Sequence, residues 1–542
     1  MPFSTWAGSN ESQIEVSSHS NDASSEGRNV SESLEETTSE IKKILGDNDD
    51  FMIHPFHVFG QHPAVLFYFS DMTDHAVINN TLLRPLKYGP RHLDVSDLPR
   101  HALMDTLMKD TLYHSEGYSE RKISVLTDNL LRGQSVVAIE GLDEAIIIDT
   151  RKITQRSIEQ PATEQVIRGA REGFIETLGT NISLLRYRLQ TPDFRVKSME
   201  IGTKTKSKVA VCYMDGITNP GIVKEVNKRL DAIEIDAVLD SGYLEQFIED
   251  NHWSPFPQIQ YTERPDKVVA NLLEGRVAIL VDGSPLALIA PTVFSQFYQT
   301  VEDYTERFLL MSAIRLSRLV ALVFSLVFPS LYVAIISFNP ELIPTEFAVA
   351  VAGGRAGVPF PAMVEVLVIE ISMEVLREAT IRLPQQVGGA LSIVGVLVIG
   401  QAAVSAGFAS PITIVIIALT TIGSFATPAY NAALALRLLR FPLIILAGIF
   451  GLYGVMVGII LIANHLLSLK SFGVPYLSPF VPGNFQGMRD LLTRGPLWKM
   501  KNRPSFLHPL NTSRLGDQMK EQVDHSSTNI MNSVQPNDEK GR

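Results

Sequence analysis

Long apolar segments, most of them without a charge, dominate the chain between residues 319 and 467, where only short links separate them. The first segment holds twenty residues without a charge, which is the length that an α-helix needs to cross a hydrocarbon core of about 30 Å. The pattern predicts about five apolar helices, at Leu319–Phe338, Pro361–Arg377, Gly388–Ala406, Pro411–Thr427 and Phe441–Leu467. We therefore expect a polytopic α-helical membrane domain over residues 301–470.

Two soluble α/β domains are expected before the apolar segments, at residues 33–150 and 151–300. In the first, apolar residues recur at helical spacing over Leu34–Leu45, and a hairpin pattern follows at Ser135–Thr150. In the second, a helix predicted over Glu164–Leu189 opens an alternation of strands and helices, which favours an α/β sandwich. The expected fold class is thus a polytopic α-helical membrane domain preceded by two cytoplasmic α/β domains.

The charges that flank the apolar segments predict which side of the membrane each part occupies. Arg307, Arg315 and Arg318 precede the first segment, and basic residues favour the cytoplasmic side. Residues 1–32 are rich in serine, so we expect a disordered N-terminal tail there. Residues 471–542 are expected to form a partly disordered C-terminal tail. Five crossings would place that tail outside, whereas its basic residues favour the cytoplasm, so its side stays open.

Composition and motifs argue against nucleic-acid binding and against catalysis. The net charge of −11 lies mainly in the front half of the chain, so nucleic acid is not an expected partner. The single cysteine, Cys212, lies in a strand-like run, which favours a buried structural thiol over a catalytic one. His54, His57 and His62 fit no standard metal spacing. Without a phosphate-binding loop or a nucleophile elbow, we predict no enzyme, no catalytic residue, no cofactor and no metal site.

A line of hydroxyl side chains follows one face of the predicted helix Pro411–Thr427. Thr413, Thr420, Ser424 and Thr427 fall within about 60° of one another on a helical wheel. Several copies around an axis could turn these hydroxyls toward water, which makes them candidate pore-lining residues. The alternative is that they bond neighbouring helices within the bundle.

Charged side chains form a second candidate site, on the predicted helix Pro361–Arg377. Glu370, Glu374 and Arg377 share one stripe of this helix, and charges at membrane depth usually face protein, water or one another. A local ion pair between Glu374 and Arg377 and a role in an ion pathway are both open. Glu365 lies on the opposite side of the helix and needs a separate partner.

The chain from about residue 34 to residue 505 resembles the A subunit of the GerA-type spore germinant receptors. The resemblance is carried by the order of several motifs, namely QRSIEQP (155–161), RGAREGF (168–174), DSGY (240–243), SPFP (254–257), YTERPDK (261–267), NLLEGR (271–276), GVPFP (357–361), GQAA (400–403) and WKMK (498–501). The chain departs from the family pattern at Ala170, where proline is frequent, and at Ala356, where an acid is frequent. A sister group, the stage V sporulation AF-type proteins, shares most of these motifs.

The resemblance implies a function in spore germination. Such A subunits lie in the inner membrane of bacterial spores, in contact with membrane lipid. They work with a transporter-like B subunit that is thought to bind the nutrient and with a lipoprotein C subunit. They are also thought to self-associate into a ring that conducts ions when the receptor is triggered. The alternatives are a membrane-anchored scaffold that does not conduct and a stage V sporulation AF-type accessory protein.

Overall fold

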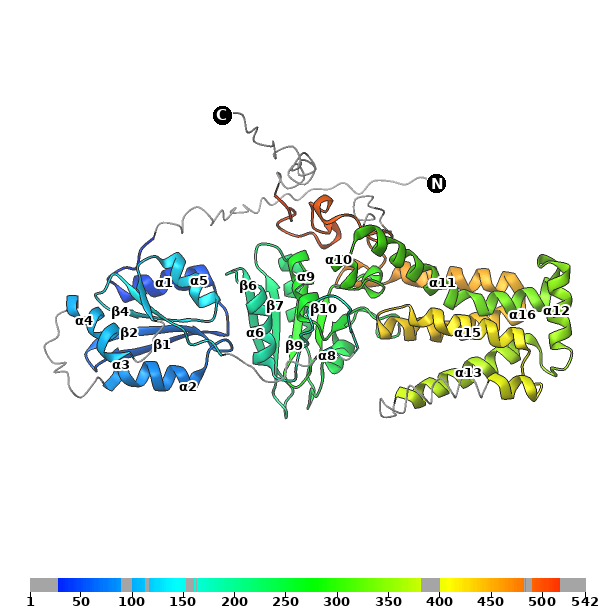
Figure 1. Ribbon diagram of the computed structural model, residues 1–542, viewed down its shortest axis with the longest axis horizontal. Helices are drawn as coiled ribbons and strands as arrows, with labels where there is room; N and C mark the ends of the chain where they lie inside the picture. The colour runs from blue at the N-terminus through cyan, green and yellow to red at the C-terminus, as the bar shows by residue number, and fades with distance from the viewer. Residues whose placement is uncertain are drawn as a thin grey trace, which may run out of the picture. The chain divides into compact units, whose positions relative to one another are not determined.

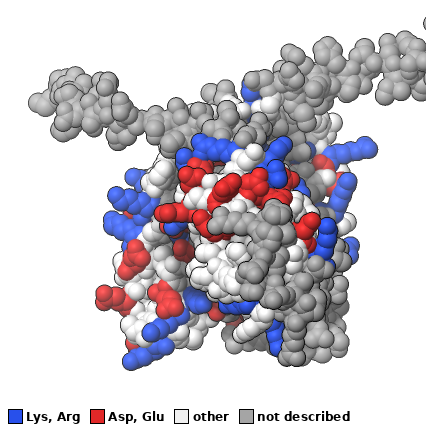
Figure 2. Space-filling view, turned by 90° about the vertical axis from the view of Figure 1, so that its left-hand side faces the viewer, with Lys and Arg blue, Asp and Glu red and all other residues white. Residues whose placement is uncertain are grey.

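A computed structural model of the chain describes residues 28–88, 100–112, 117–152, 160–161, 163–381, 400–481, 483 and 490–516. The chain divides into two compact units (Figure 1). Unit 1 comprises Met1–Thr154 with Gln190–Pro192, and unit 2 comprises Gln155–Leu189 with Asp193–Arg542. Figure 2 shows acidic and basic side chains close together on the face in view, as on an ordinary hydrated protein surface.

Unit 1 is built around an antiparallel five-stranded sheet with helices on both faces (Figure 1). The strand order is β1-β2-β4-β5-β3, with β1 Phe51–Val58, β2 His62–Phe69, β3 Tyr118–Glu120, β4 Ser135–Ile139 and β5 Ala145–Ile148. Alternate residues of a strand point to opposite faces. Val65 and Phe67 therefore pack with helices α1 (Leu34–Leu45) and α5 (Ile123–Leu131), while Leu66 packs on the other face.

The second face of this sheet is covered by shorter helices, α2 His75–Val77, α3 Arg84–Tyr88 and α4 Arg100–Thr106, with π-helical turns at Ile78–Leu83 and Leu107–Thr111. The amphipathic helix predicted from Leu34 and the hairpin predicted over Ser135–Thr150 are both confirmed, by α1 and by the β4–β5 pair. In the segment 28–32, Val30 is 5% exposed and its amide donates to Arg121 O at 2.7 Å. Residues 28–32 are thus packed against unit 1, although we expected them to belong to a disordered tail.

The α/β part of unit 2 repeats the topology of unit 1. Its strand order is β6-β7-β9-β10-β8, with β6 Phe194–Ile201, β7 Ser207–Met214, β8 Gln260–Thr262, β9 Val277–Val281 and β10 Ala287–Ala290. Helices α6 (Leu178–Arg188) and α9 (Pro265–Glu274) cover one face, and α7 (Pro220–Asp231) and α8 (Ser241–Ile248) cover the other. The same order of strands in both sheets shows that the two α/β folds are structural repeats.

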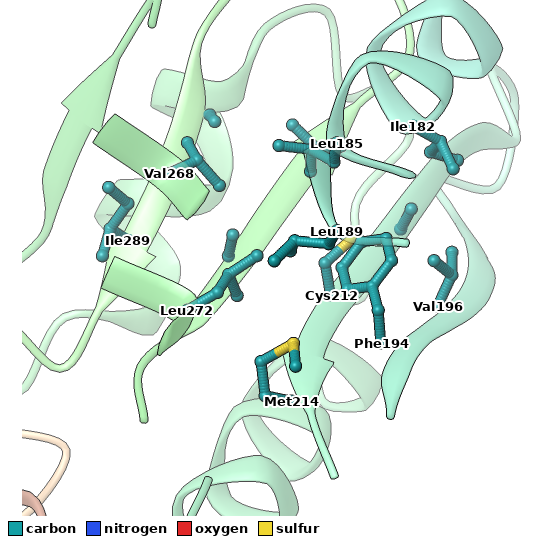
Figure 3. Packing of buried hydrophobic residues seen from close by; sticks show 14 of the residues in the cluster. Ile182, Leu185, Leu189, Phe194, Val196, Cys212, Met214, Val268, Leu272 and Ile289 are labelled. Atoms are coloured by element: carbon teal, nitrogen blue, oxygen red, sulfur yellow. The ribbon is translucent and has the colours of Figure 1, made fainter. Parts of the chain in front are cut away.

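Figure 3 shows the first of these faces, where Leu185 of α6 and Leu272 of α9 lie over the sheet. Cys212 is fully buried in this core, in agreement with the structural interpretation of its thiol. The helix predicted over Glu164–Leu189 is wrong in its first half, because α6 begins only at Leu178. The preceding segment is irregular and holds Gly169 at a φ of 153°, a conformation that opposes a helix.

The apolar segments form helices α11 Phe308–Phe338, α12 Thr345–Arg355, α13 Ala362–Ile381, α15 Pro411–Phe425 and α16 Tyr430–Ser468, and the short α10 Glu302–Thr305 precedes them. Two of these, α11 and α16, are long and apolar enough to cross a membrane, and α15 is a shorter apolar helix. The segment expected at Gly388–Ala406 lies outside the described residues up to residue 399. A polytopic arrangement therefore stays a prediction for this part of the chain.

Helix α16 reverses its direction at Gly451, where φ is 63° and ψ is −141°. A Cβ atom built on Gly454 would lie 2.1 Å from Leu446 O. In a straight helix, two residues eight positions apart are about 12 Å apart along the axis, so the two arms of α16 must pack against each other, antiparallel. The segment expected as one helix over Phe441–Leu467 is instead the end of one arm and most of the next.

After α16 the chain returns to the α/β part of unit 2. A short hairpin, β11 Lys470–Ser471 with β12 Val474–Pro475, follows the helix. Ser471 Oγ donates to Gln258 O at 2.7 Å, and the buried Tyr476 donates its hydroxyl to Pro257 O at 2.7 Å. The expected C-terminal tail is therefore packed where it is described, up to residue 516. Its apolar residues follow neither a helical nor a strand period, so the sequence pattern did not indicate the packing.

Candidate functional site: buried polar groups among the apolar helices

The hydroxyl face of α15 is buried inside the single chain. Thr413 and Thr420 are 0% exposed, Ser424 is 4% and Thr427 is 7% exposed. Thr413 Oγ1 lies 3.0 Å from the hydroxyl of Tyr332 on α11. Thr413, Thr420 and Ser424 thus share the buried face of α15, which is consistent with the wheel geometry, whereas Thr427 is buried just beyond the end of that helix at Phe425.

Close backbone approach seals the buried face of α15. A Cβ atom built on Gly423 of α15 would lie 3.2 Å from Ala321 O of α11. Thr420 donates its hydroxyl to Ile417 O at 2.9 Å and Ser424 donates to Thr421 O at 2.7 Å, within their own helix. These contacts favour the helix-packing alternative for the resting chain, and a pore-lining role stays a prediction for an assembled, open state.

The charged stripe of α13 meets two arginines of α16. Arg440 Nη1 donates to both carboxylate oxygens of Glu370, at 2.9 and 2.8 Å. The side chains of this pair are 3% and 6% exposed. Arg437 Nε lies 3.6 Å from Glu374 Oε1, and Arg377 forms the expected i,i+3 pair with Glu374. The three predicted residues are therefore brought together into one ion-pair cluster.

The last apolar segment predicted from the sequence begins only at Phe441, so Arg437 and Arg440 fell outside it and their part in this cluster was missed. Both lie within the first arm of α16, which begins at Tyr430. The signal was their spacing of three residues, which places two guanidinium groups on one helical face. Glu365 finds a separate partner as expected: Arg355 Nε donates to it at 3.2 Å, and Ser410 N donates at 2.6 Å.

A second buried charge cluster joins α11 to the segment that follows α16. Arg315 donates from Nε to Asp303 Oδ2 at 3.0 Å and from Nη1 to Asp490 Oδ1 at 3.1 Å, and Arg318 donates to Asp303 Oδ1 at 2.9 Å. Arg315 and Asp303 are both 0% exposed. Tyr304 donates its hydroxyl to Asp490 Oδ2 at 2.8 Å. We call this set of residues the α11 joint.

Burial is the largest influence on the pKa values of Asp490 and Tyr304 in the α11 joint. It raises the pKa of Asp490, although the Arg315 guanidinium and the Tyr304 hydroxyl favour the ionised carboxylate. Burial also raises the pKa of Tyr304 well above its ordinary value, so this hydroxyl stays a hydrogen-bond donor at physiological pH. From the sequence, Arg315 and Arg318 served only to predict the side of the membrane. Their acidic partners could not be recognised, because Asp303 lies in the short α10 and Asp490 lies 175 positions after Arg315.

The arrangement provides ion pairs and hydrogen bonds that hold helices together, and nothing in it resembles an acid–base or nucleophile–base pair. Among the described residues, no group of three or more His, Cys, Asp or Glu side chains is placed to hold a metal ion. The polar groups therefore stabilise the packing of α11, α13, α15 and α16.

Comparisons with known proteins agree on one family. The model of the family described as "Bacillus/Clostridium GerA spore germination protein" matches residues 39–506. Spore germination protein KA of Bacillus subtilis is 43% identical over 94% of this chain and 93% of its own length. GerLA of Bacillus cereus is 38% identical over 88% and 95%, and the uncharacterized membrane protein YfkQ of B. subtilis is 41% identical over 88% and 92%.

A crystal structure of the N-terminal domain of the A subunit of the Bacillus megaterium spore germinant receptor GerK3 also matches. It covers 49% of this chain and 97% of that domain, at 33% identity and with a TM-score of 0.39.

Proposed function

The chain belongs to the GerA family of Bacillus and Clostridium spore germination proteins, and from this premise we propose that it is an A-type subunit of a nutrient receptor in the inner membrane of a bacterial spore. The observation that carries the proposal is the match over residues 39–506, which includes both α/β folds and the apolar helices. Its partners would be a transporter-like B subunit and a lipoprotein C subunit. Spores without the chain should lose a nutrient response and still germinate with agents that bypass receptors.

We further propose an even number of membrane crossings, with the α/β folds and the C-terminal segment on the cytoplasmic side. The contacts of Ser471 and Tyr476 with residues 257–258 support this, because they place the chain after α16 beside the domain that precedes α11. If each arm of α16 crosses the membrane, the reversal at Gly451 would add the crossing that the sequence count lacked. A tag at the C-terminus should be reached by protease only from the cytoplasmic side of sealed vesicles. Digestion from the opposite side would refute this topology.

Several copies would form a ring that conducts ions when nutrient on a partner favours an open state. Because the hydroxyls of α15 are buried against α11 at rest, opening would require these two helices to separate. A ring of hydroxyl groups would then face water, as in a polar pore lining.

Cysteine labelling tests this step directly, since the only native thiol, Cys212, is buried. Ser424→Cys should react with a charged thiol reagent only after nutrient is added. Ser372→Cys, on the opposite helix α13, serves as the control for general accessibility, and its labelling should not change. Equal labelling of Ser424→Cys before and after triggering, in spores that still release ions, would exclude the proposed pathway.

The second candidate function is a scaffold that assembles the receptor without conducting. The complete burial of Thr413 and Thr420 favours it. Thr420→Val separates the two, because it removes a hydroxyl whose partner is its own helix backbone and keeps the side-chain shape. A scaffold should tolerate Thr420→Val fully, whereas a conducting ring should release ions more slowly.

A further inference from the structure

A large cavity opens beside the α11 joint. Its volume is about 1300 Å³, and helix α9, the first turns of α11 and the C-terminal segment from Asp490 to Arg514 line it. Seven lysine or arginine residues and three aspartate or glutamate residues contribute to the lining. The cavity therefore carries an excess of positive charge in a chain whose net charge is −11.

The acids of the lining are already neutralised. Asp490 accepts from Arg315, Glu274 pairs with Arg276, and Asp266 pairs with Arg264 at 2.7 Å. In the part of the chain that the structure describes, the lining residues Arg494, Lys499, Arg503 and Arg514 form no ion pair with a carboxylate. The uncompensated charge of the cavity is therefore positive.

Arg494 is a buried cation of the cavity lining that has no carboxylate partner among the described residues. Its side chain is 5% exposed, and its guanidinium donates only to backbone oxygens, at 3.2 Å to Tyr304 and at 3.4 Å to Glu306. Its Nε has no hydrogen-bond partner among the described residues. A buried cation without a counter-charge is costly. Burial and the neighbouring Arg514 lower the pKa of Arg503, so Arg503 and Arg514 are two further cations close to each other in the lining.

The start of α11 carries exposed apolar side chains beside the cavity. Leu309, which lines the cavity, is 72% exposed, and Leu310 is 55% exposed. The ring of Trp498 packs edge-on against Phe308 at 5.9 Å. Exposed leucines beside an aromatic pair, at the start of an apolar helix, are typical of the membrane interface. Basic residues at this position favour anionic lipid headgroups.

We propose that this cavity binds the phosphate headgroup of an anionic phospholipid, with the phosphate near Arg494 and Lys499 and the acyl chains leaving along Leu309 and Leu310. This proposal depends on the membrane location of α11 in the proposed function, and it adds a lipid ligand to that function. Phosphate oxygens provide the acceptors that the guanidinium and ammonium groups lack. Bound lipid would tie the C-terminal segment to the beginning of α11.

The test uses the full-length protein in detergent and native mass spectrometry. Phosphatidylglycerol, phosphatidylcholine and inorganic phosphate are titrated separately. The test variant Lys499→Gln/Arg514→Gln removes two exposed charges of the cavity. The matched control Lys224→Gln/Lys228→Gln removes two exposed charges from α7, which does not line the cavity. We expect wild-type protein to prefer phosphatidylglycerol, and the cavity variant to bind it about thirty-fold more weakly, since each basic residue contributes roughly a five-fold factor. The control should bind as the wild type does.

Three results would overturn the proposal. If the protein binds phosphatidylcholine as tightly as phosphatidylglycerol, the charge of the lipid does not matter for binding. If the cavity variant and the control variant lose affinity for phosphatidylglycerol to the same extent, the lipid does not bind in the cavity. Binding of inorganic phosphate as tightly as phosphatidylglycerol would assign the site to a free anion. The proposed receptor function is tested separately. If the protein binds the lipid but does not restore nutrient germination to spores that lack it, the proposed function is wrong and the lipid site still stands.

Discussion

The reversal of α16 gives the sharpest prediction, because it depends on a single missing Cβ atom. In Gly454→Ala that atom would lie 2.1 Å from Leu446 O, 1.3 Å short of the 3.4 Å at which ordinary contact begins. Since the obstructing atom belongs to the backbone of the other arm, the two arms must move apart. Overpacking of this kind costs about 3 kcal/mol, which lowers the ratio of folded to unfolded protein by about 150-fold.

Thermal denaturation of the full-length protein in detergent, followed by the loss of the monodisperse fraction, measures this change. Gly353→Ala is the matched control, because Gly353 lies in α12 with nothing within 4 Å of its built Cβ atom and without a positive φ. We expect the control to be as stable as the wild type, or up to about 1 kcal/mol more stable, because alanine is the better helix former. If Gly454→Ala denatures together with Gly353→Ala, the antiparallel packing of the two arms is wrong.

The other predictions concern buried charges. Removing one partner of the Glu370–Arg440 pair, as in Glu370→Gln, should destabilise the protein by about 3–5 kcal/mol. A double variant with Arg440→Met should recover most of that loss, which a double-mutant cycle on thermal stability would measure. Asp303→Asn should destabilise the α11 joint by several kcal/mol in the same assay, because Arg315 would lose its fully buried counter-charge. Burial, with nearby acids, raises the pKa of Glu245 on α8 to about 7. The folded state therefore binds this proton more tightly than the unfolded state, and stability should fall as the pH rises from about 4.5 to 7, by at most about 3 kcal/mol; Glu245→Gln should flatten that pH dependence of the denaturation midpoint.

Periodicity predicted the elements whose one face is buried in a local core. The helix from Leu34 and the hairpin near Gly141 follow from a repeated spacing of apolar residues, and tertiary packing agrees with that local pattern. The same reasoning extended a helix too far before Leu178. There the chain is irregular, because Phe174 N donates to Glu263 O at 2.7 Å and the intervening glycines weaken the helical alternative.

The sequence predicted only those residues of the candidate site that lie on one helix, because contacts between distant parts of the chain leave no local pattern. Glu370, Glu374 and Arg377 were found because their shared face is a property of one helix. Their partners on α16 come from about 70 positions further along the chain, and no local pattern reports such a contact. The reversal at Gly451 was not predicted either, since a positive φ leaves no trace in composition.

The α11 joint and the buried hydroxyl face of α15 together constrain the opening that we propose. The beginning of α11 is held by the ion pairs of Arg315 with Asp303 and Asp490. Further along, Tyr332 of α11 contacts the hydroxyl of Thr413 on α15. The second arm of α16 contacts the α/β fold of unit 2, where Ser254 Oγ lies 2.9 Å from His465 Nε2. Moving α11 away from α15 while the domain stays in place would strain or break the buried pairs of Arg315, at about 3–5 kcal/mol. An unliganded receptor would then hold fewer than about one in a hundred molecules open. A partner that rotates the α/β fold together with α11 would avoid that cost, so we expect the trigger to act through the domain and not through the helix alone.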